Sequence, residues 1–423
     1  MSRLPTRCQP MLVCLTICLV TGPSSRSHAE PPDAKPLAPI TVSDQALRIH
    51  RSAILIDGHN DLPWALRKRV NSDFNRADIS KNQPQFHTDI PRLQRGGVGG
   101  QFWSAYAPAE TRAQKRAAQY VLEQIKLIHQ MVKRYPDTFE MVDTADDIVR
   151  IRKSGKIASL IGVEGGHAIE NSLALLRHYY SLGVRYMTLT HSDTLDWADS
   201  ATDTARHGGL TPFGEDVVRT MNELGMLVDI SHVSVETMQD ALRVSQAPII
   251  ASHSSAYAIA KHPRNIPDDV LRQVAKNGGV VMVNFYSGFI VPESARRMTR
   301  MFDVRRELRK QNPKDSDFNT ALQQWRKENP ILPGTIHDVV DHIEHIVRVA
   351  GIDHCGIGSD YDGVSMLPAQ LHDVSTYPSI TQILLDRGYN AEQIHKILGG
   401  NVLRALRQAE ETAQRIRTRQ KRR

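Results

Sequence analysis

The chain has 423 residues, long enough for one large α/β barrel or two to three ordinary domains, and its 40% hydrophobic and 23% charged residues exclude disorder of the whole chain. The formal net charge of +7 comes from the ends, because residues 1–29 hold three Arg, residues 412–423 hold five Arg and one Lys, and neither segment has an acidic residue. The rest of the chain carries a net charge of −2, so the sequence offers no basic domain for binding nucleic acid.

The first predicted element is a signal peptide at residues 1–29. Arg3 and Arg7 precede an apolar run at residues 11–20 (MLVCLTICLV), and small residues occupy the positions that a signal peptidase requires before Ala29. The apolar run is too short to span a bilayer. We therefore expect export, with cleavage after Ala29 and a periplasmic or secreted mature chain.

A retained membrane anchor, or a lipid on Cys18, is the alternative, although Ile17 is too bulky for the usual lipoprotein cleavage pattern. Cleavage leaves Cys355 as the only cysteine, so an internal disulfide is excluded from the mature chain. The Pro-rich, polar residues 30–45 predict a flexible linker before the folded domain begins.

The folded domain is expected at residues 46–411, where short apolar runs rich in Val, Ile and Tyr recur. Eight of them are predicted strands: 53–57, 100–106, 157–163, 185–190, 226–231, 248–252, 279–285 and 355–359. Helical spacing and helix start signals lie between most of them, as at 234–244, 267–276 and 335–350. Eight strands separated by helices favour an α/β fold, a (β/α)8 TIM barrel; an open doubly wound sheet is the alternative, but no strand runs into a GxGxxG turn.

Residues 287–334 interrupt the pattern before the last strand with about two Arg-rich helices. This helical insertion is a lid, an oligomer contact or a solvated helical pair. Residues 377–423 predict C-terminal helices that pack on the barrel and end in the basic tail at 412–423.

The active site of a parallel β/α barrel lies at the carboxyl ends of its strands. His59 and Asp61 follow the first predicted strand two residues apart, so their side chains point the same way. The third, fifth, sixth and eighth strands end in, respectively, Glu164, His232, His253 and Asp360. A role as a helix cap or in a buried hydrogen bond would explain any one of these six polar residues at a strand end. It is a poor explanation for all six together.

This set matches a two-metal site, which needs a bridging carboxylate and terminal imidazole ligands. We expect Glu164 to bridge, His59 and Asp61 to bind one ion, and His232 and His253 to bind the other. Imidazole with carboxylate suits zinc, although the ligand types also admit manganese or cobalt.

Nine strings then resemble, in order over residues 46–410, the membrane (renal) dipeptidase family of metallopeptidases. They are IDGHNDLPW (56–64), GGQFWSAY (99–106), GVEGGHAI (162–169), YMTLTHSDTLDWADS (186–200), DISHVS (229–234), ASHSSAY (251–257), HPRNIPDDVL (262–271), VNFY (283–286) and GIGSDYDG (356–363). The resemblance implies a barrel of the metal-dependent amidohydrolase type that holds two zinc ions and hydrolyses dipeptides. Members of the family are often dimeric, which makes a homodimer an expectation.

The resemblance assigns the same five ligands, with a hydroxide bridging the two zinc ions. It adds three substrate-binding residues: His191 to polarise the scissile carbonyl, Arg264 to bind the substrate carboxylate, and Asp360 as the acid/base at the amine. All eight positions are present in this sequence.

Several other residues have simpler interpretations. His342 and His345, together with His337, lie on a predicted helix and are expected to be structural, as is the packing histidine His167. Cys355 lacks an activating base and is expected to be a buried, inert thiol. Trp64 and Tyr286 either line the pocket or pack on the barrel rim.

Two other functions remain open. The same metal site could act on an N-acyl amino acid, a lactone or a β-lactam; Arg264 argues for a substrate with a free carboxylate. The second alternative is a non-catalytic envelope protein, but the intact set of metal ligands argues against it. The tail from Arg415 to Arg423 could still attach a working enzyme weakly to an anionic envelope surface.

Overall fold

The computed structural model describes residues 37–422. The predicted signal peptide at 1–29 and residues 30–36 of the predicted linker lie outside the described residues. Leu37 and Ala38 are exposed and precede the compact unit that runs from Pro39 to the C-terminus. Within the described part of the chain, the helices are too short or too polar to cross a membrane.

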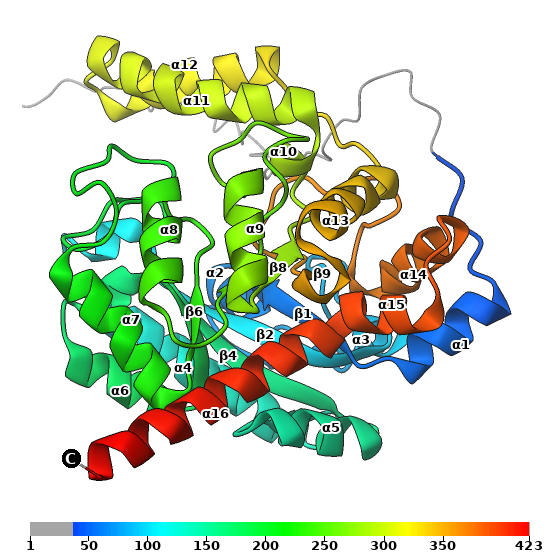
Figure 1. The fold of residues 1–423 in the computed structure, drawn as a ribbon. Coiled ribbons are helices and arrows are strands. Elements are labelled where there is room, and N and C mark those ends of the chain that lie inside the picture. The colour runs from blue at the N-terminus through cyan, green and yellow to red at the C-terminus, as the bar shows by residue number, and fades with distance from the viewer. Residues whose placement is uncertain (1–36, 423) are drawn as a thin grey trace, which may run out of the picture. The chain divides into compact units, whose positions relative to one another are not determined.

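A closed ring of eight parallel strands forms the centre of this unit (Figure 1). The strands are β1 (Leu55–Asn60), β2 (Val98–Tyr106), β3 (Phe139–Met141), β4 (Ile157–Glu164), β5 (Val184–Thr188), β6 (Leu227–Asp229), β7 (Ile250–Ala251), β8 (Val280–Val283) and β9 (Cys355–Ile357). β2 pairs with both β1 and β4, and the ring continues from β4 through β5 to β9 and back to β1. The predicted (β/α)8 barrel is confirmed.

The eight ring strands are those predicted from the sequence, with ends that differ by up to three residues. β3 was not predicted: it has only three residues, of which one is buried, and it pairs with the first part of β4 outside the ring. All residues of β1 and β4 are buried, because helices cover a parallel barrel outside and side chains fill it inside.

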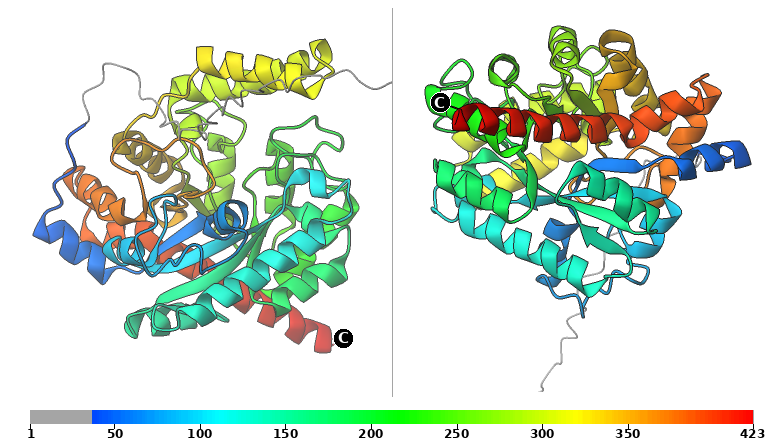
Figure 2. Two further views of the ribbon diagram at one scale, coloured as in Figure 1. Left: turned by 180° about the vertical axis from the view of Figure 1, so that it is seen from behind. Right: turned by 60° about the horizontal axis from the view of Figure 1, so that its bottom comes forward.

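Helices separate most of the strands and cover the barrel (Figure 2). They are α1 (Asp44–Ser52), α2 (Leu62–Val70), α3 (Ile90–Arg95), α4 (Ala117–Arg134), α5 (Ala145–Lys153), α6 (Leu173–Ser181), α7 (Pro212–Leu224), α8 (Val235–Val244), α9 (Asp268–Asn277), α10 (Ser287–Ile290), α11 (Pro292–Gln311), α12 (Asp315–Glu328), α13 (Ile336–Ala350), α14 (Tyr377–Asp386), α15 (Ala391–His395) and α16 (Asn401–Lys421).

Local sequence explains where several helices begin. The Ser234 side chain accepts a hydrogen bond from the backbone N–H of Thr237 at the start of α8, and Thr335 forms a capping box with Asp338 at the start of α13. Gly225 ends α7 in the left-handed conformation that a glycine adopts without strain. These three boundaries follow from the sequence alone.

The helix α16 crosses the barrel at the end opposite to α11 and α12 (Figure 1). Its apolar face, which includes Leu406 and Ala409, joins a buried cluster with barrel residues such as Phe102, Leu160 and Met282. The helix thereby covers the barrel interior at that end with apolar side chains.

Replacing Leu406, which is 1% exposed, by Ala is expected to destabilise the protein by about 2–5 kcal/mol through lost burial and the cavity left behind. The free energy of unfolding, measured by denaturant titration of the purified protein, checks this. Gln414→Ala on the exposed side of the same helix is the control and should change stability by less than about 0.5 kcal/mol. Equal stability of the two variants would show that α16 does not contribute to this core.

The ends of the domain differ in detail from the expected ones. α1 begins at Asp44 and buries Ala46, so residues 44–45 of the predicted linker are helical. The predicted basic tail at 412–423 continues α16 through Lys421, and Thr412 and Ala413 are buried against the domain. Thr412 and Ala413 follow Ala409 by three and four residues, so they lie on the same apolar face of the helix as Leu406 and Ala409.

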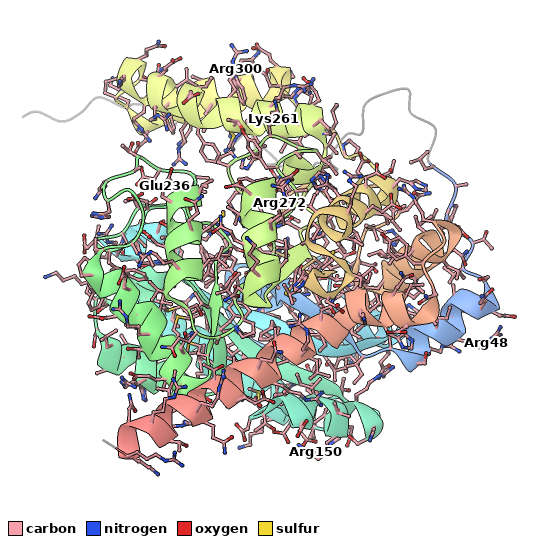
Figure 3. All side chains as sticks on the ribbon, in the orientation of Figure 1. Arg48, Arg150, Glu236, Lys261, Arg272 and Arg300 are labelled. Atoms are coloured by element: carbon pink, nitrogen blue, oxygen red, sulfur yellow. The ribbon has the colours of Figure 1, made fainter. Side chains whose placement is uncertain are left out.

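The insertion at 287–334 is helical, as predicted, and forms α10, α11 and α12. α11 and α12 pack side by side through buried residues such as Phe318 and Leu322 of α12. Most of their charged side chains are exposed, as for the labelled Arg300 in Figure 3. Because the insertion follows β8, it lies at the carboxyl end of the barrel.

Candidate metal centre

Seven of the eight predicted site residues lie at or just after the carboxyl end of a strand, and Arg264 lies farther along the loop that follows β7. His59 is in β1 and Asp61 follows it, while Glu164 is the last residue of β4. The remaining residues lie in loops after β5, β6, β7 and β9: His191, His232, His253, Arg264 and Asp360. The barrel therefore brings all eight to one end, which is the end where such barrels carry their active sites.

Glu164 is the centre of the arrangement. Its Oε1 atom lies 3.1 Å from Nε2 of His232, 3.5 Å from Nε2 of His253, and 3.7 Å from Nε2 of both His59 and His191. On the other side of the centre, Nε2 of His59 lies 3.2 Å from Oδ2 of Asp61. Four imidazoles and two carboxylates thus direct nitrogen and oxygen atoms into one small volume.

Three overlapping groups of these residues are close enough to hold a metal ion. Within each group the ligand atoms lie within 4.8 Å of one another, and the groups are His59–Glu164–His253, Glu164–His191–His232 and His59–Asp61–Asp360. Glu164 and His59 each belong to two groups. Nε2 of His59 is buried and faces only carboxylate oxygens, those of Asp61 at 3.2 Å and Glu164 at 3.7 Å, an arrangement that suits a shared metal ion. Nitrogen and oxygen ligands of this kind fit zinc.

The charges at the centre also fit cations. Burial, aided by positive neighbours, lowers the pKa values of His191, His232 and His253 well below the usual histidine range, so these rings are neutral and able to bind a metal. Burial alone would lower the pKa of His59 too, but Asp61 and Glu164 outweigh it and raise that pKa to about 10. The position of His59 therefore attracts positive charge.

The carboxyl groups at the centre also lack enough positive charge around them. Burial raises the pKa of Glu164 and of Asp360, and the negative charge of Asp61 raises both further against the opposing effect of His59. Several carboxylates lie close together in a buried site with too little positive charge to balance them. Divalent cations would supply that charge.

Two of these residues have unusual backbone conformations. His232 has a φ of 69° and Asp360 a φ of 65°, the left-handed region in which residues other than glycine are strained. Such strain persists where the surrounding structure holds it, and it occurs often at active sites. Asn284 holds Asp360 in place by donating a hydrogen bond of 2.8 Å to Oδ2.

Arg264 lies beside the metal cluster with part of its guanidinium unpaired. It is 2% exposed; Nη1 donates to Oγ of Ser254 at 3.2 Å and Nη2 to the His253 carbonyl at 3.3 Å, while Nε is buried without a hydrogen-bond partner among the described residues. Burial lowers the pKa of Arg264 to about 10, against the effect of Asp360, so the group stays charged at neutral pH. A buried cation with an unused N–H suits an anionic group of a substrate.

A cavity of about 360 Å³ opens over these groups. Besides six of the predicted site residues, its lining consists of Trp64, Tyr106, Tyr286, Phe289, Gly363, Val364 and Ser365. The ring of Tyr106 packs on Trp64 at 5.1 Å and on His191 at 4.8 Å between ring centroids. Trp64 and Tyr286 are therefore pocket residues, one of the two interpretations that the sequence left open.

The residues expected to be structural have ordinary partners. His342 bonds to the backbone of Ala256 and of Ile290, and His345 bonds to Asp268 at 2.7 Å, away from the centre. Nε2 of His167 donates to the Ala107 carbonyl. Cys355 is fully buried, and burial raises the pKa of its thiol to about 12, so it is not a nucleophile at neutral pH.

Five lining residues were not singled out in the sequence, and two of them, Tyr106 and Phe289, are aromatic. Tyr106 is the last residue of a predicted strand, so the strand-end rule that found Glu164 could have found it too. Phe289 lies inside the insertion, where no local pattern marks it, yet its ring covers the Arg264 guanidinium at 5.3 Å. Tyr286, beside it, reaches Met298 of α11, which joins the insertion to the cavity wall.

Solved structures share this fold over most of the chain. A probable dipeptidase, PvdM from Pseudomonas aeruginosa, is 24% identical with a TM-score of 0.76, covering 87% of this chain and 98% of its own. Dipeptidase AC, a metallopeptidase of family M19, is 24% identical with a TM-score of 0.70, covering 85% and 99%. A metallopeptidase from Rhodobacter sphaeroides, solved with a phosphinate mimic of L-Ala-D-Ala, is 23% identical with a TM-score of 0.69, covering 85% and 100%.

A family model also matches the sequence of this chain. The model of membrane dipeptidases, peptidase family M19, matches residues 43–420, which include the barrel, the insertion and all eight site residues. Together with the cluster of ligand side chains at the carboxyl end of the barrel, this match makes the chain a member of the membrane dipeptidase family M19, a family of metal-dependent dipeptidases.

Proposed function

We propose that this chain is an exported dinuclear zinc dipeptidase that hydrolyses dipeptides with a free C-terminal carboxylate. The observation that carries the proposal is the convergence of four histidine Nε2 atoms on Oε1 of Glu164, within 3.1–3.7 Å, beside a buried arginine with an unpaired N–H. The histidine cluster around Glu164 suits two cations that share a carboxylate, and the buried arginine suits the carboxylate of a substrate.

Five residues would hold the zinc ions. His59 and Asp61 would bind one ion and His232 and His253 the other. Glu164 would be shared by both, since its Oε1 atom lies within 3.7 Å of Nε2 of all three histidines. When bound, the zinc pair supplies hydroxide at neutral pH by lowering the pKa of water, and it polarises the scissile carbonyl.

The protein's own residues orient the substrate. Arg264 would bind the C-terminal carboxylate with its free Nε–H, which places the scissile carbonyl one residue away, toward the metal ligands. His191 lies 3.7 Å from Glu164 and faces the cavity, where its ring can stabilise the oxyanion that forms at this carbonyl. The rings of Trp64, Tyr106 and Tyr286 line the same cavity and would limit the entry of bulk water.

Asp360 would exchange protons with the substrate amine. It lines the same cavity, and burial with neighbouring negative charge raises its pKa, so it can both take up and release a proton near neutral pH. The hydrogen bond from Asn284 keeps Oδ2 occupied and leaves Oδ1 for the amine.

The proposal is tested by elemental analysis of the purified mature chain together with hydrolysis of L-Ala-D-Ala and L-Ala-L-Ala. We choose the first substrate because the Rhodobacter neighbour binds a mimic of it. Near two zinc per chain, with activity removed by a chelator and restored by zinc, is the expected result. No bound metal and no metal-dependent hydrolysis would exclude the site assignment.

The matched control for substrate class is the C-terminal amide of the same dipeptide. It keeps the scissile bond but lacks the anion that Arg264 binds, so we expect kcat/KM to fall by about 10²-fold or more, as for loss of one charge-assisted contact of roughly 3 kcal/mol. Equal cleavage of dipeptide and amide, or preference for a lactone, would favour the alternative amidohydrolase function.

Export and surface attachment are further parts of the proposal. The N-terminal pattern supports cleavage after Ala29, which the intact mass of the mature chain tests. Arg415, Arg417 and Arg419 are exposed on the last turns of α16 and support weak binding to an anionic envelope surface. Because Thr412 and Ala413 are buried, the deletion that tests attachment at low salt begins at Arg415.

A further inference from the structure

Two of the histidines at the metal centre each use their second ring nitrogen in a buried hydrogen bond. Nδ1 of His59 lies 2.8 Å from the hydroxyl of Tyr186, and Nδ1 of His253 lies 2.7 Å from Oγ of Ser252. A neutral imidazole carries one proton, and only the nitrogen without it can bind a metal. The directions of these two hydrogen bonds therefore decide whether Nε2 is available.

The direction of the hydrogen bond between His59 and Tyr186 follows from a second contact of the Tyr186 hydroxyl. Its hydroxyl has a single hydrogen, which it donates to the Gly58 carbonyl at 3.2 Å, and a carbonyl can only accept. The Tyr186 oxygen is then the acceptor for Nδ1–H of His59. In the neutral ring that a metal ion requires, this leaves the lone pair on Nε2 of His59, a buried atom that faces the carboxylates of Asp61 and Glu164.

The direction of the hydrogen bond between His253 and Ser252 follows from the contacts of Asp229, which is fully buried. Its Oδ1 accepts from the backbone N–H groups of Ser231 at 3.0 Å and Ser252 at 2.8 Å. Its Oδ2 accepts from the hydroxyls of Thr188 at 2.5 Å and Ser252 at 2.7 Å. The only hydrogen of the Ser252 hydroxyl is thereby used, so Oγ accepts Nδ1–H of His253 and the lone pair again lies on Nε2.

The barrel holds these groups in place. Thr188 and Asp229 are register partners on β5 and β6, and Ser252 follows β7, the next strand in the ring. The ring of Tyr186 fills the barrel interior opposite Gly162, where a Cβ atom would lie 2.0 Å from the Tyr186 Cζ atom. Glycine at 162 is therefore what allows the tyrosine to reach His59.

We propose that Tyr186 and the Asp229–Ser252 pair are positioning residues that hold His59 and His253 in the Nδ1–H form and so direct both Nε2 lone pairs to the metal centre. The inference rests on the proposed function, because it concerns the affinity of that same centre for zinc. None of the three residues lines the cavity. They act on the metal through the two histidines and not on the substrate.

The test is the zinc affinity of the full mature chain, measured by competition with a chromophoric chelator at fixed pH. Tyr186→Phe removes only the hydroxyl, and we expect its zinc affinity to fall by about 10–100-fold, as for other partners of metal ligands. Added zinc should restore most of its activity. The matched control is Tyr179→Phe, which removes another buried tyrosine hydroxyl bonded to a carbonyl, that of Ala168, outside the centre.

Ser252→Ala provides a second, independent variant, with Ser287→Ala as its control because the Ser287 hydroxyl bonds to the Pro333 carbonyl away from the centre. A loss of thermal stability without a loss of zinc affinity, in both Tyr186→Phe and Ser252→Ala, would overturn the inference while the proposed function stands. Absence of zinc binding by the unaltered chain would overturn both.

Discussion

Replacing Glu164 by Gln is expected to reduce the zinc content below two ions per chain and to lower kcat/KM by at least about 10³-fold, since metal ions supply several kcal/mol of transition-state stabilisation. Gln keeps the size of the side chain but loses the charge that four histidine Nε2 atoms face within 3.7 Å. Elemental analysis and steady-state kinetics on the same preparation check both parts of this expectation.

The control for this variant is Glu170→Gln. Glu170 lies on the same stretch of chain after β4, but its side chain is exposed and accepts a hydrogen bond from the backbone of Ala118. It should keep the zinc content and the activity of the unaltered protein. A Glu164→Gln variant that keeps two zinc ions and full activity would show that this carboxylate does not bridge the metals.

Replacing Asp360 by Asn is expected to lower kcat by about 10²–10⁴-fold, the usual contribution of a general acid or base, and to leave the zinc content unchanged. The backbone tolerates the substitution, because Asn accepts the left-handed conformation that Asp360 adopts with a φ of 65°. Zinc content and kcat, measured with the dipeptide that the enzyme hydrolyses best, separate a role in proton transfer from a role in metal binding.

Asp193→Asn is the control for this variant. Asp193 is an exposed acid on the loop after β5, and burial of part of its side chain raises its pKa, as at Asp360, but it does not line the cavity. Its activity should stay within about twofold of the unaltered protein. If Asp360→Asn loses zinc, and added zinc restores its activity, then Asp360 binds the metal and does not transfer the proton.

The strand-end rule explains why so much of the site was predicted. In a parallel barrel each apolar run ends at the same side of the molecule, so the polar residue that follows it is placed by local sequence alone. This holds for Asp61, Glu164 and His253, which lie within two residues of a strand end. Arg264 lies farther along its loop, and its place followed from the family resemblance.

The sequence by itself determined the barrel, its helical insertion and the end at which the polar residues gather, because strand and helix patterns depend on neighbours a few residues apart. Only the tertiary structure decided that Tyr186 and Asp229 lie where they can position the histidines of the metal centre. Both are strand residues inside the strings that resemble the family, but no local pattern gives them a role. Tyr186 contacts His59 directly and Asp229 reaches His253 through Ser252, by hydrogen bonds that join different strands. The same holds for α16, which covers the barrel end through contacts with strands far away in the chain. Such contacts depend on closing the ring, and a linear sequence does not display which side chains that closure brings together.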